Sequence, residues 1–303
     1  MIDPQLTNHE TKQLKIGPYE ILPVLTGSFG LDGGAMFGTV PKVLWEKTNP
    51  ADEKNRIQME ARALLLKSKD RNILIDTGNG SDFVEKYGEK LGQQFSKMYN
   101  VAEAENDLLS SLKMHNVSAN QITDVILTHL HFDHAGGATC WKQNKLVPTF
   151  PKATYHLHKQ NLLTAQKPNV REKASYFPAN YQPLLDSQCL KLYEEETNLI
   201  FPNIQTWISN GHTIGHQAVI IEDDRQQLIY CGDVIPTSSH IRSAWIMGYD
   251  LDPLKIIEEK RQLLQRSLKK QTFYFFEHDP YCDMATVTVD QNEFKLKEKF
   301  WLK

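Results

Sequence analysis

Cysteine is scarce in this chain, and its spacing excludes two classes of protein. Four cysteines occur in 303 residues, and no two of them form a CxxC pair. They are Cys140, Cys189, Cys231 and Cys282. A disulfide framework needs several regularly spaced cysteines, and a cysteine-based zinc site needs paired thiolates. The sequence therefore predicts neither, and the cysteine usage favours a reducing cytoplasm as the location.

Long apolar runs and blocks of basic residues are also missing. The first fifteen residues, MIDPQLTNHETKQLK, are polar and do not resemble a secretion signal, and no later run approaches the length of a membrane span. The 34 Lys and Arg residues against 37 Asp and Glu residues give a net charge of −3, without a basic cluster that would bind phosphates. We therefore expect neither a membrane nor a nucleic acid as a partner.

The chain does have short apolar runs that each end in a polar turn. Hydrophobic residues make up 40% of the sequence, which is enough for a large core. The pattern predicts buried strands at residues 73–75, 125–127, 206–208, 217–221, 228–230 and 272–276. Three of these six runs are followed directly by Asp or Glu, and the other three by a His or Asp within four positions. Such an arrangement lets one sheet edge collect polar groups from distant parts of the sequence.

Two helices are predicted between the strands. Asp252 and Pro253 form an N-cap and first-turn pair for a helix in a run rich in Lys, Glu, Gln and Arg. The apolar face of this helix is predicted to consist of Leu254, Ile257, Leu264 and Leu268. A second helix is predicted over residues 101–114, with acidic residues in its first half, where the helix dipole favours them.

Residues 128–137, THLHFDHAGG, contain a close grouping of potential metal ligands. His129, His131, Asp133 and His134 fall within six positions, directly after an apolar run at 122–127. Histidine and aspartate compete poorly for core space, so packing alone does not explain this density. Imidazoles and carboxylates together suit Zn²⁺ and related metals, and four donors from one loop exceed what one tetrahedral ion takes. The segment therefore predicts a site for two metal ions.

Later strand ends supply further donors. His129 and His131 lack a third imidazole, and His212 is the preferred candidate because Gly211 beside it lets the backbone approach closely. His216 is the competing choice and is otherwise interpreted as a structural residue near the metal.

A shared carboxylate and a late histidine complete the predicted site. Two neighbouring cations need an anionic bridge, and Asp233 stands at a strand end. His278 follows another strand, and its neighbours Glu277 and Asp279 are candidates to orient its ring through a hydrogen bond. The predicted donors are His129, His131 and His212 for one ion, Asp133, His134 and His278 for the other, and Asp233 for both.

In this order, HxHxDH, GHTxGH, GD and a late His resemble the motifs of metallo-β-lactamase-fold hydrolases, over residues 73–278. The resemblance implies an α/β fold, a four-layer αββα sandwich with the metals at one edge of its two sheets. It also implies a single domain over residues 1–303, built from two βα halves that divide near residue 150.

Two more segments, residues 31–45 and 232–250, look like those of lactonase-like members, a group that includes N-acyl-homoserine lactone lactonases and organophosphate hydrolases. Class B β-lactamases carry a Cys at the position of Asp233, which disfavours antibiotic hydrolysis. The glutathione-binding tail of glyoxalase II enzymes has no clear counterpart. The best-known lactonases place a Tyr three residues after the shared Asp, where this chain has Pro236, so that role is unfilled or passes to another group.

The predicted activity is hydrolysis of a small ester, with a lactone as the first choice, by a hydroxide shared between two divalent metal ions. Two cations that share a water lower its pKa toward neutrality and polarise the scissile carbonyl. Asp133 and Asp233 are the predicted catalytic carboxylates, and Asp133 is a candidate to move a proton to the leaving group. Zinc is the first choice of metal, with Fe, Mn or Co as alternatives.

Other functions and assemblies stay open. Phosphotriester and glyoxalase II-like thioester hydrolysis are the alternative reactions. A redox role such as that of flavodiiron proteins is disfavoured, because those usually replace the second imidazole with Glu whereas this chain has His131. A binding role is disfavoured because every donor position is filled. A small molecule is the expected partner, and a homodimer is a possible assembly.

Three residues are candidate substrate contacts. His240 lies seven positions beyond Asp233 and is predicted either to hydrogen-bond the substrate or to be a surface-loop residue. Met36 and Phe37 are predicted to form either an apolar pocket wall or ordinary core. Residues 167–183, which contain three prolines, are interpreted as an excursion that lines the pocket entrance or as a surface insertion.

Overall fold

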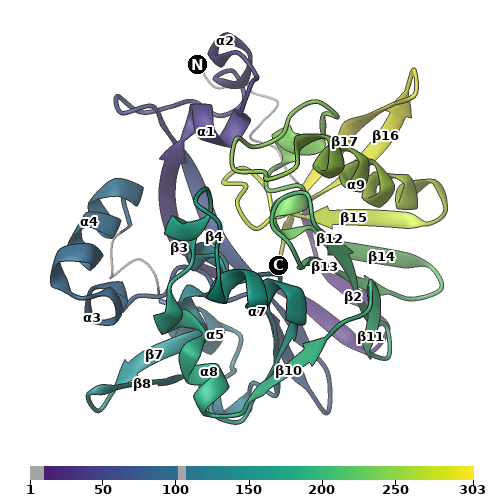
Figure 1. Cartoon of the computed structure of the whole chain (residues 1–303). Coiled ribbons are helices and arrows are strands. Elements are labelled where there is room, and N and C mark those ends of the chain that lie inside the picture. Colours follow the sequence, from purple (N-terminus) through teal and green to yellow (C-terminus); the bar gives the residue numbers. More distant parts are fainter. Residues whose placement is uncertain (1–9, 102–106) are drawn as a thin grey trace.

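The computed structural model describes residues 10–101 and 107–303, which form two facing β-sheets with helices on the outer side of each (Figure 1). Within these residues one sheet has seven strands in the order β10-β9-β6-β5-β4-β3-β2. Its strands are β2 (Leu14–Ile16), β3 (Tyr19–Asp32), β4 (Arg56–Lys67), β5 (Asn72–Ile75), β6 (Asp124–Ile126), β9 (Thr154–His158) and β10 (Leu190–Tyr193).

The second sheet has eight described strands in the order β1-β17-β16-β15-β14-β13-β12-β11. They are β1 (Glu10–Lys12), β11 (Thr197–Phe201), β12 (Ile204–Ser209), β13 (His216–Glu222), β14 (Gln226–Tyr230), β15 (Gln271–Phe275), β16 (Met284–Asp290) and β17 (Glu293–Leu302). A separate hairpin pairs β7 (Thr139–Lys142) with β8 (Lys145–Pro148).

Most helices are short, and α4 and α9 are the longest in the described part of the chain. The helices are α1 (Gly33–Phe37), α2 (Lys42–Trp45), α3 (Phe83–Tyr87), α4 (Glu89–Tyr99), α5 (Leu108–Met114), α6 (Phe132–Ala135), α7 (Lys159–Gln166), α8 (Gln182–Asp186) and α9 (Pro253–Gln265). No helix among the described residues is both long and apolar enough to span a membrane.

Strand alternation builds the layers. Successive side chains of a strand point to opposite faces of the sheet. In β13, Val219 and Ile221 pack in the core between the two sheets, whereas Ile220 packs with Ile256 and Leu263 of α9 on the outer face. The first sheet repeats this arrangement: its inner face joins the central core, and its outer face packs against α5, α7 and α8. The four-layer αββα sandwich implied by the motifs is therefore confirmed.

The predicted strands are present, but the place where the chain changes sheet is different from the prediction. The resemblance implies two halves that divide near residue 150. In the structure β9 and β10 still belong to the first sheet, and the second sheet takes over at β11. The reason is that β9 pairs in parallel with β6, and β10 with β9, which extends the first sheet to Tyr193.

The helix at 253 begins as predicted, but two of the four residues predicted for its apolar face are exposed, whereas Leu264 is buried as predicted. The Asp252 carboxylate accepts a hydrogen bond from Lys255 N, and Pro253 occupies the first turn of α9. However, Leu254 is 80% exposed and Leu268 is 66% exposed. The buried residues of α9 include two charged ones, and they are Ile256, Glu259, Lys260, Leu263 and Leu264. Because charged residues occupy the inward face, hydrophobic periodicity alone does not locate it.

The helix predicted over residues 101–114 is observed only as α5, which begins at Leu108. Asp107 is its N-cap, and its carboxylate accepts a hydrogen bond from Ser110 N. Val101 lies outside the helix, and residues 102–106, with the predicted acidic Glu103 and Glu105, lie outside the described residues. Leu108 and Leu112 are buried, whereas Leu109 is partly exposed.

Candidate metal centre

The predicted donors lie at one edge of the sandwich because the strands that precede them run in the same direction. In the first sheet β5 and β6 are parallel, and their carboxyl ends lead to Asp76 and to the loop with His129. In the second sheet β12 and β14 are both antiparallel to β13, and β14 is parallel to β15. The carboxyl ends of β12, β14 and β15 therefore meet, and they lead to His212, Asp233 and His278 respectively.

Two glycines make room at these strand ends. Gly232 has φ +49°, and a Cβ atom there would lie 2.5 Å from Nε2 of His216. A Cβ atom on Gly211 would lie 2.5 Å from the backbone nitrogen of Ile256 in α9. Real Cβ contacts are longer than this, so each position requires glycine. The close backbone approach predicted at Gly211 is therefore confirmed.

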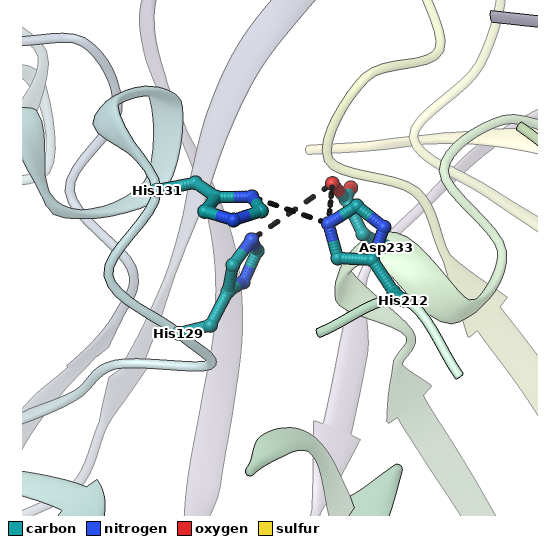
Figure 2. A group of neighbouring side chains, drawn as sticks. All are labelled: His129, His131, His212 and Asp233. Carbon is teal, nitrogen blue, oxygen red and sulfur yellow. Dashed lines mark hydrogen bonds and ion pairs between the residues drawn. The ribbon is translucent and has the colours of Figure 1, made fainter. Parts of the chain in front are cut away.

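The first donor group combines His129, His131, His212 and Asp233, whose side chains point toward one another (Figure 2). His212 Nε2 lies 3.1 Å from Asp233 Oδ2 and 3.2 Å from His131 Nδ1. His129 Nε2 lies 3.9 Å from the same oxygen of Asp233. All four side chains are buried.

The second donor group combines Asp133, His134 and His278, and Asp233 connects it to the first. His278 Nε2 lies 3.2 Å from His134 Nε2 and 3.2 Å from Asp233 Oδ1. The carboxylate of Asp133 lies 3.8 Å from His278 Nε2 and 3.9 Å from His134 Nε2. Asp233 therefore faces both groups: Oδ2 lies nearest to His212 and 3.5 Å from His134 Nε2, and Oδ1 lies nearest to His278.

The spacing of these donors fits metal ions. With bonds of roughly 2.0–2.1 Å, two donors on one tetrahedral zinc ion lie about 3.3 Å apart. The contacts of His212 with Asp233 and His131, and of His278 with His134 and Asp233, are 3.1–3.2 Å. Nε2 of His129 is buried and has no hydrogen-bond partner among the described residues. A buried lone pair without a partner is costly unless a cation uses it, so the donor set fits two divalent metals.

Metal binding requires neutral imidazoles and ionised carboxylates, and the surroundings of His129, His131 and Asp233 favour these states. Burial and the neighbouring imidazoles lower the pKa of His129 and His131 well below the usual value, so both rings stay neutral. Burial alone would raise the pKa of Asp233, but three surrounding imidazoles outweigh it and hold this pKa well below its usual range. Burial opposes a charged ring at His278, yet the Asp233 carboxylate raises the pKa of His278 to about 9. Protons therefore compete with metals for this site.

Buried oxygens orient the donor imidazoles from behind. His212 Nδ1 lies 3.0 Å from Asp250 Oδ1, and Asp250 also accepts a hydrogen bond from Met247 N. His278 Nδ1 lies 2.8 Å from the carbonyl oxygen of Glu60. Such hydrogen bonds fix the tautomer and direction of a metal-binding ring. Asp250 and the Glu60 carbonyl are absent from the sequence prediction, because both lie far from their partners in the chain and carry no local motif.

The residues predicted to orient His278 have other partners. Glu277 turns away and lies 2.9 Å from His134 Nδ1, where Asp76 also lies at 3.0 Å. Burial raises the pKa of Glu277 to about 8. Asp279 instead accepts hydrogen bonds from the backbone of Ser238 and Tyr281. The prediction that Glu277 or Asp279 orients His278 is therefore wrong, since a backbone carbonyl takes this place.

His216 lies behind the first donor group. Its Nε2 accepts a hydrogen bond of 3.0 Å from Asp233 N, so this lone pair is not directed at a metal. His212 lies in the donor group and His216 supports the backbone of the shared carboxylate, which agrees with the predicted preference.

Helix α9 holds two loops of the site through adjacent buried charges. The Glu259 carboxylate accepts hydrogen bonds from Ser209 Oγ at 2.6 Å, Asn210 N at 2.8 Å and Gly211 N at 2.9 Å. These three donors precede His212 directly. Lys260 Nζ donates to the carbonyl oxygens of Arg242 and Trp245, and burial lowers its pKa to about 7. The two residues together fix the His212 loop and the loop that leads to Asp250.

Replacing Glu259 with Ala should loosen the His212 loop. Three buried donors would lose their acceptor, which we expect to lower the free energy of unfolding by roughly 2–4 kcal/mol. We also expect roughly 10- to 100-fold weaker binding of one metal equivalent, as for other groups that orient a metal ligand. Urea unfolding and competition with a zinc chelator measure the two effects. Glu258→Ala, at the exposed neighbouring position, is the matched control and should change neither quantity.

A pocket of about 240 Å³ opens onto the two donor groups. Its wall is largely apolar on one side, with Leu31, Met36, Tyr99, Phe132, Met247 and Tyr249. Arg171, Glu172 and Ser175 line the other side, so residues 167–183 contribute to the pocket. Glu172 accepts a hydrogen bond from Thr213 Oγ1, and the Tyr176 ring packs on His131 with a centroid distance of 4.7 Å. The excursion therefore lines the site, in agreement with one of its two interpretations.

Of the three predicted substrate contacts, only Met36 lines this pocket. Phe37 lies behind it and stacks on Trp45 and His240, with centroid distances of 5.4 and 4.8 Å. His240 is 1% exposed, and its ring nitrogens face Thr237 Oγ1 at 2.7 Å and the Met36 carbonyl at 2.9 Å. His240 is thus neither a substrate contact nor a surface residue, because both of its nitrogens have partners inside the fold. It fixes α1 behind the pocket wall.

The burial of His240 predicts a dependence of stability on pH. Burial lowers the pKa of His240 from 6.5 to about 4. Between these values the unfolded chain binds a proton that the folded chain excludes, so stability is complete above pH 6.5 and falls as the pH drops toward 4. The loss attributable to His240 is roughly 3 kcal/mol over this interval. Urea unfolding at several pH values, compared with His240→Gln, measures it; equal pH slopes in the two proteins would contradict the assignment.

Known proteins resemble this chain over most of its length. The sequence model of the metallo-beta-lactamase superfamily matches residues 60–278. An N-acyl homoserine lactonase from Bacillus cereus is 25% identical over 240 residues, which are 74% of this chain and 83% of the lactonase. A probable metal-dependent hydrolase from Staphylococcus aureus has a TM-score of 0.82 and 30% identity, over 94% of this chain and 99% of that chain. AidC, a dizinc quorum-quenching lactonase, has a TM-score of 0.76 and 23% identity, over 97% and 99% of the two chains.

The matched segment contains the whole candidate metal centre. The matched segment begins at Glu60, whose carbonyl orients His278, and ends at His278 itself. It contains all seven residues of the two donor groups. With its αββα sandwich and its donors at one edge of the two sheets, the chain belongs to the metallo-β-lactamase superfamily.

Proposed function

We propose that this chain is a dinuclear metal-dependent hydrolase that acts on a small ester, with a lactone as the preferred substrate. The observation that carries the proposal is the position of Asp233, whose carboxylate contacts both donor groups in a pocket with one apolar side. The relatives named lactonases and the metal-dependent hydrolase point in the same direction. From its cysteine usage, the cytoplasm is the compartment that we propose.

The donor residues would hold two divalent ions, zinc in the first instance, with His129, His131 and His212 around one and Asp133, His134 and His278 around the other. When bound, such a pair supplies Lewis acidity and lowers the pKa of a water molecule. Asp233 connects the two donor groups through its contacts with His212 and His278. Asp250 keeps the His212 ring directed at them.

The pocket residues would orient the substrate. The Asp133 carboxylate lines the pocket beside His278, so it is placed to carry a proton to the leaving group. Pro236 provides no hydroxyl for substrate, but the phenols of Tyr99 and Tyr249 line the pocket and can donate to a carbonyl oxygen. Leu31, Met36 and Met247 would exclude water from an apolar acyl group.

A panel of substrates tests the proposal. Metal-assayed protein is offered a γ-lactone with an acyl side chain, an aryl ester, a thioester, a phosphotriester and a β-lactam. We expect the lactone to show the highest kcat/KM and the β-lactam no turnover. Fastest turnover of the phosphotriester or the thioester would replace the lactone with one of these alternatives. No turnover of any of the five would contradict the proposed function.

A further inference from the structure

A second groove, of about 730 Å³, adjoins the metal pocket and shares part of its lining. It lies between the end of β3, the start of β4 and the end of α4. Figure 1 shows α3 and α4 at one flank of the molecule, outside β3 and β4. Three residues, Leu31, Tyr99 and Tyr249, line both the pocket and the groove. The pocket and the groove therefore share these three side chains as a common wall.

The groove is lined by both apolar and cationic side chains. Met98, which is 63% exposed, joins Leu31, Tyr99 and Tyr249 in the apolar part of the lining. Three cationic side chains, those of Lys54, Arg56 and Lys97, complete it. An apolar chain would contact the apolar part, and an anion at its end would then meet the cations.

Two of these cations are available to a ligand. Arg56 is paired with Asp52 at 2.7 Å, so its charge is largely compensated. Lys54 and Lys97 form no ion pair with any other described residue, and both are exposed. Asp32 is the acidic residue that lines the groove, and its carboxylate accepts hydrogen bonds from Ala35 N and Asn55 Nδ2. The groove lining thus has three cationic side chains against one carboxylate, and two of the cations, Lys54 and Lys97, form no ion pair with a described residue.

In the lining of the metal pocket, carboxylates outnumber permanently cationic side chains. The single guanidinium, that of Arg171, donates to the carbonyl oxygen of Gly248 at 2.5 Å. Asp133, Glu172 and Asp233 line the same pocket and repel an anion placed among them away from the metals. A substrate with a remote anionic group would therefore extend into the groove.

We propose that the groove binds the far end of the substrate, and that this end carries an anionic group, a carboxylate or a phosphate, next to Lys54 and Lys97. The inference rests on the proposed function for the nature of the bond cleaved, and it adds to that function a substrate of stated chemistry: an ester or lactone with an apolar chain that ends in an anion.

Binding of product analogues tests the groove without relying on turnover. The metal-loaded protein is titrated calorimetrically with straight-chain monoacids and with α,ω-diacids of the same length, from four to ten carbons. One carboxylate can occupy the metal site, so the other reports on the groove. We expect at least one diacid to bind about five- to tenfold more tightly than its monoacid, because two exposed lysines each contribute modestly. Monoacids that carry an ω-phosphonate in place of the second carboxylate are titrated in the same way. Their affinity relative to the diacids shows whether the groove prefers a phosphate-like group or a carboxylate.

Charge reversal shows whether the lysines are responsible. The double variant Lys54→Glu with Lys97→Glu should abolish the preference for the diacid and leave monoacid binding unchanged. The matched control is Lys69→Glu with Lys113→Glu, two exposed lysines that do not line the groove, and it should keep the preference. The proposal is overturned if no diacid binds more tightly than its monoacid, or if the double variant keeps the preference. If a diacid binds more tightly than its monoacid but none of the five substrates is turned over, only the proposed function is rejected.

Discussion

Replacing Asp233 with Asn is expected to reduce kcat/KM by at least about 1000-fold, which corresponds to roughly 4 kcal/mol of transition-state stabilisation. The carboxylate faces His212 at 3.1 Å and His278 at 3.2 Å, so both donor groups lose their shared anion at once. Asn keeps the shape of the side chain but not its charge. We therefore also expect the metal content to fall from two ions per chain to one or fewer, measured by atomic absorption on the same samples that are assayed.

An exposed carboxylate outside the site controls for the change in net charge. Asp224→Asn lies in the turn between β13 and β14, away from the donor groups, and should keep full activity and metal content. Asp233→Asn protein that retains two metals and wild-type kcat/KM would show that this carboxylate is not shared between two ions.

Removal of the metals is expected to lower the melting temperature by roughly 10 °C or more. A ligand present at 1000 times its Kd stabilises the folded state by about 4 kcal/mol, so two ions contribute roughly 8 kcal/mol. For a chain of this size, 1 kcal/mol corresponds to about 1–2 °C. Without the ions, the buried imidazoles and carboxylates of the two donor groups depend on one another and on protons alone. Differential scanning calorimetry before and after chelation measures the shift.

Restoration by metal distinguishes this effect from damage by the chelator. Addition of zinc to the chelated protein should return the melting temperature, whereas addition of magnesium, which prefers oxygen ligands, should not. The Asp233→Asn variant should show a much smaller shift. An unchanged melting temperature after verified loss of metal would mean that the donor groups do not bind metal tightly.

Much of the site could be predicted because its chemistry lies at strand ends. Each donor follows an apolar run that the sequence shows clearly, and parallel strands bring those ends to one edge of the sandwich. The preference for His212 over His216 agrees with the structure because the strand β13 begins at His216 itself. The order of the motifs predicted the αββα fold, but the division near residue 150 that came with it is too early, because the chain changes sheet only after β10.

The groups that hold the donors in place could not be predicted. Asp250 orients His212 across 38 positions of sequence, and Glu259 holds the same loop from a helix that comes later in the chain. Neither contact has a local pattern. His240 was misplaced for the same reason: its partner is the Met36 carbonyl, 204 positions away, and only tertiary structure brings the two together. The inward face of α9 could not be predicted from hydrophobic periodicity either, because charged residues are buried on it.

Anomalous X-ray scattering at the zinc edge, from crystals of the zinc-loaded protein, tests the central claim most directly. The account predicts two peaks per chain, one within the group of His129, His131 and His212 and one within the group of Asp133, His134 and His278, with Asp233 bonded to both. A single peak, or a second peak that Asp233 does not reach, would contradict a dinuclear centre with a shared carboxylate.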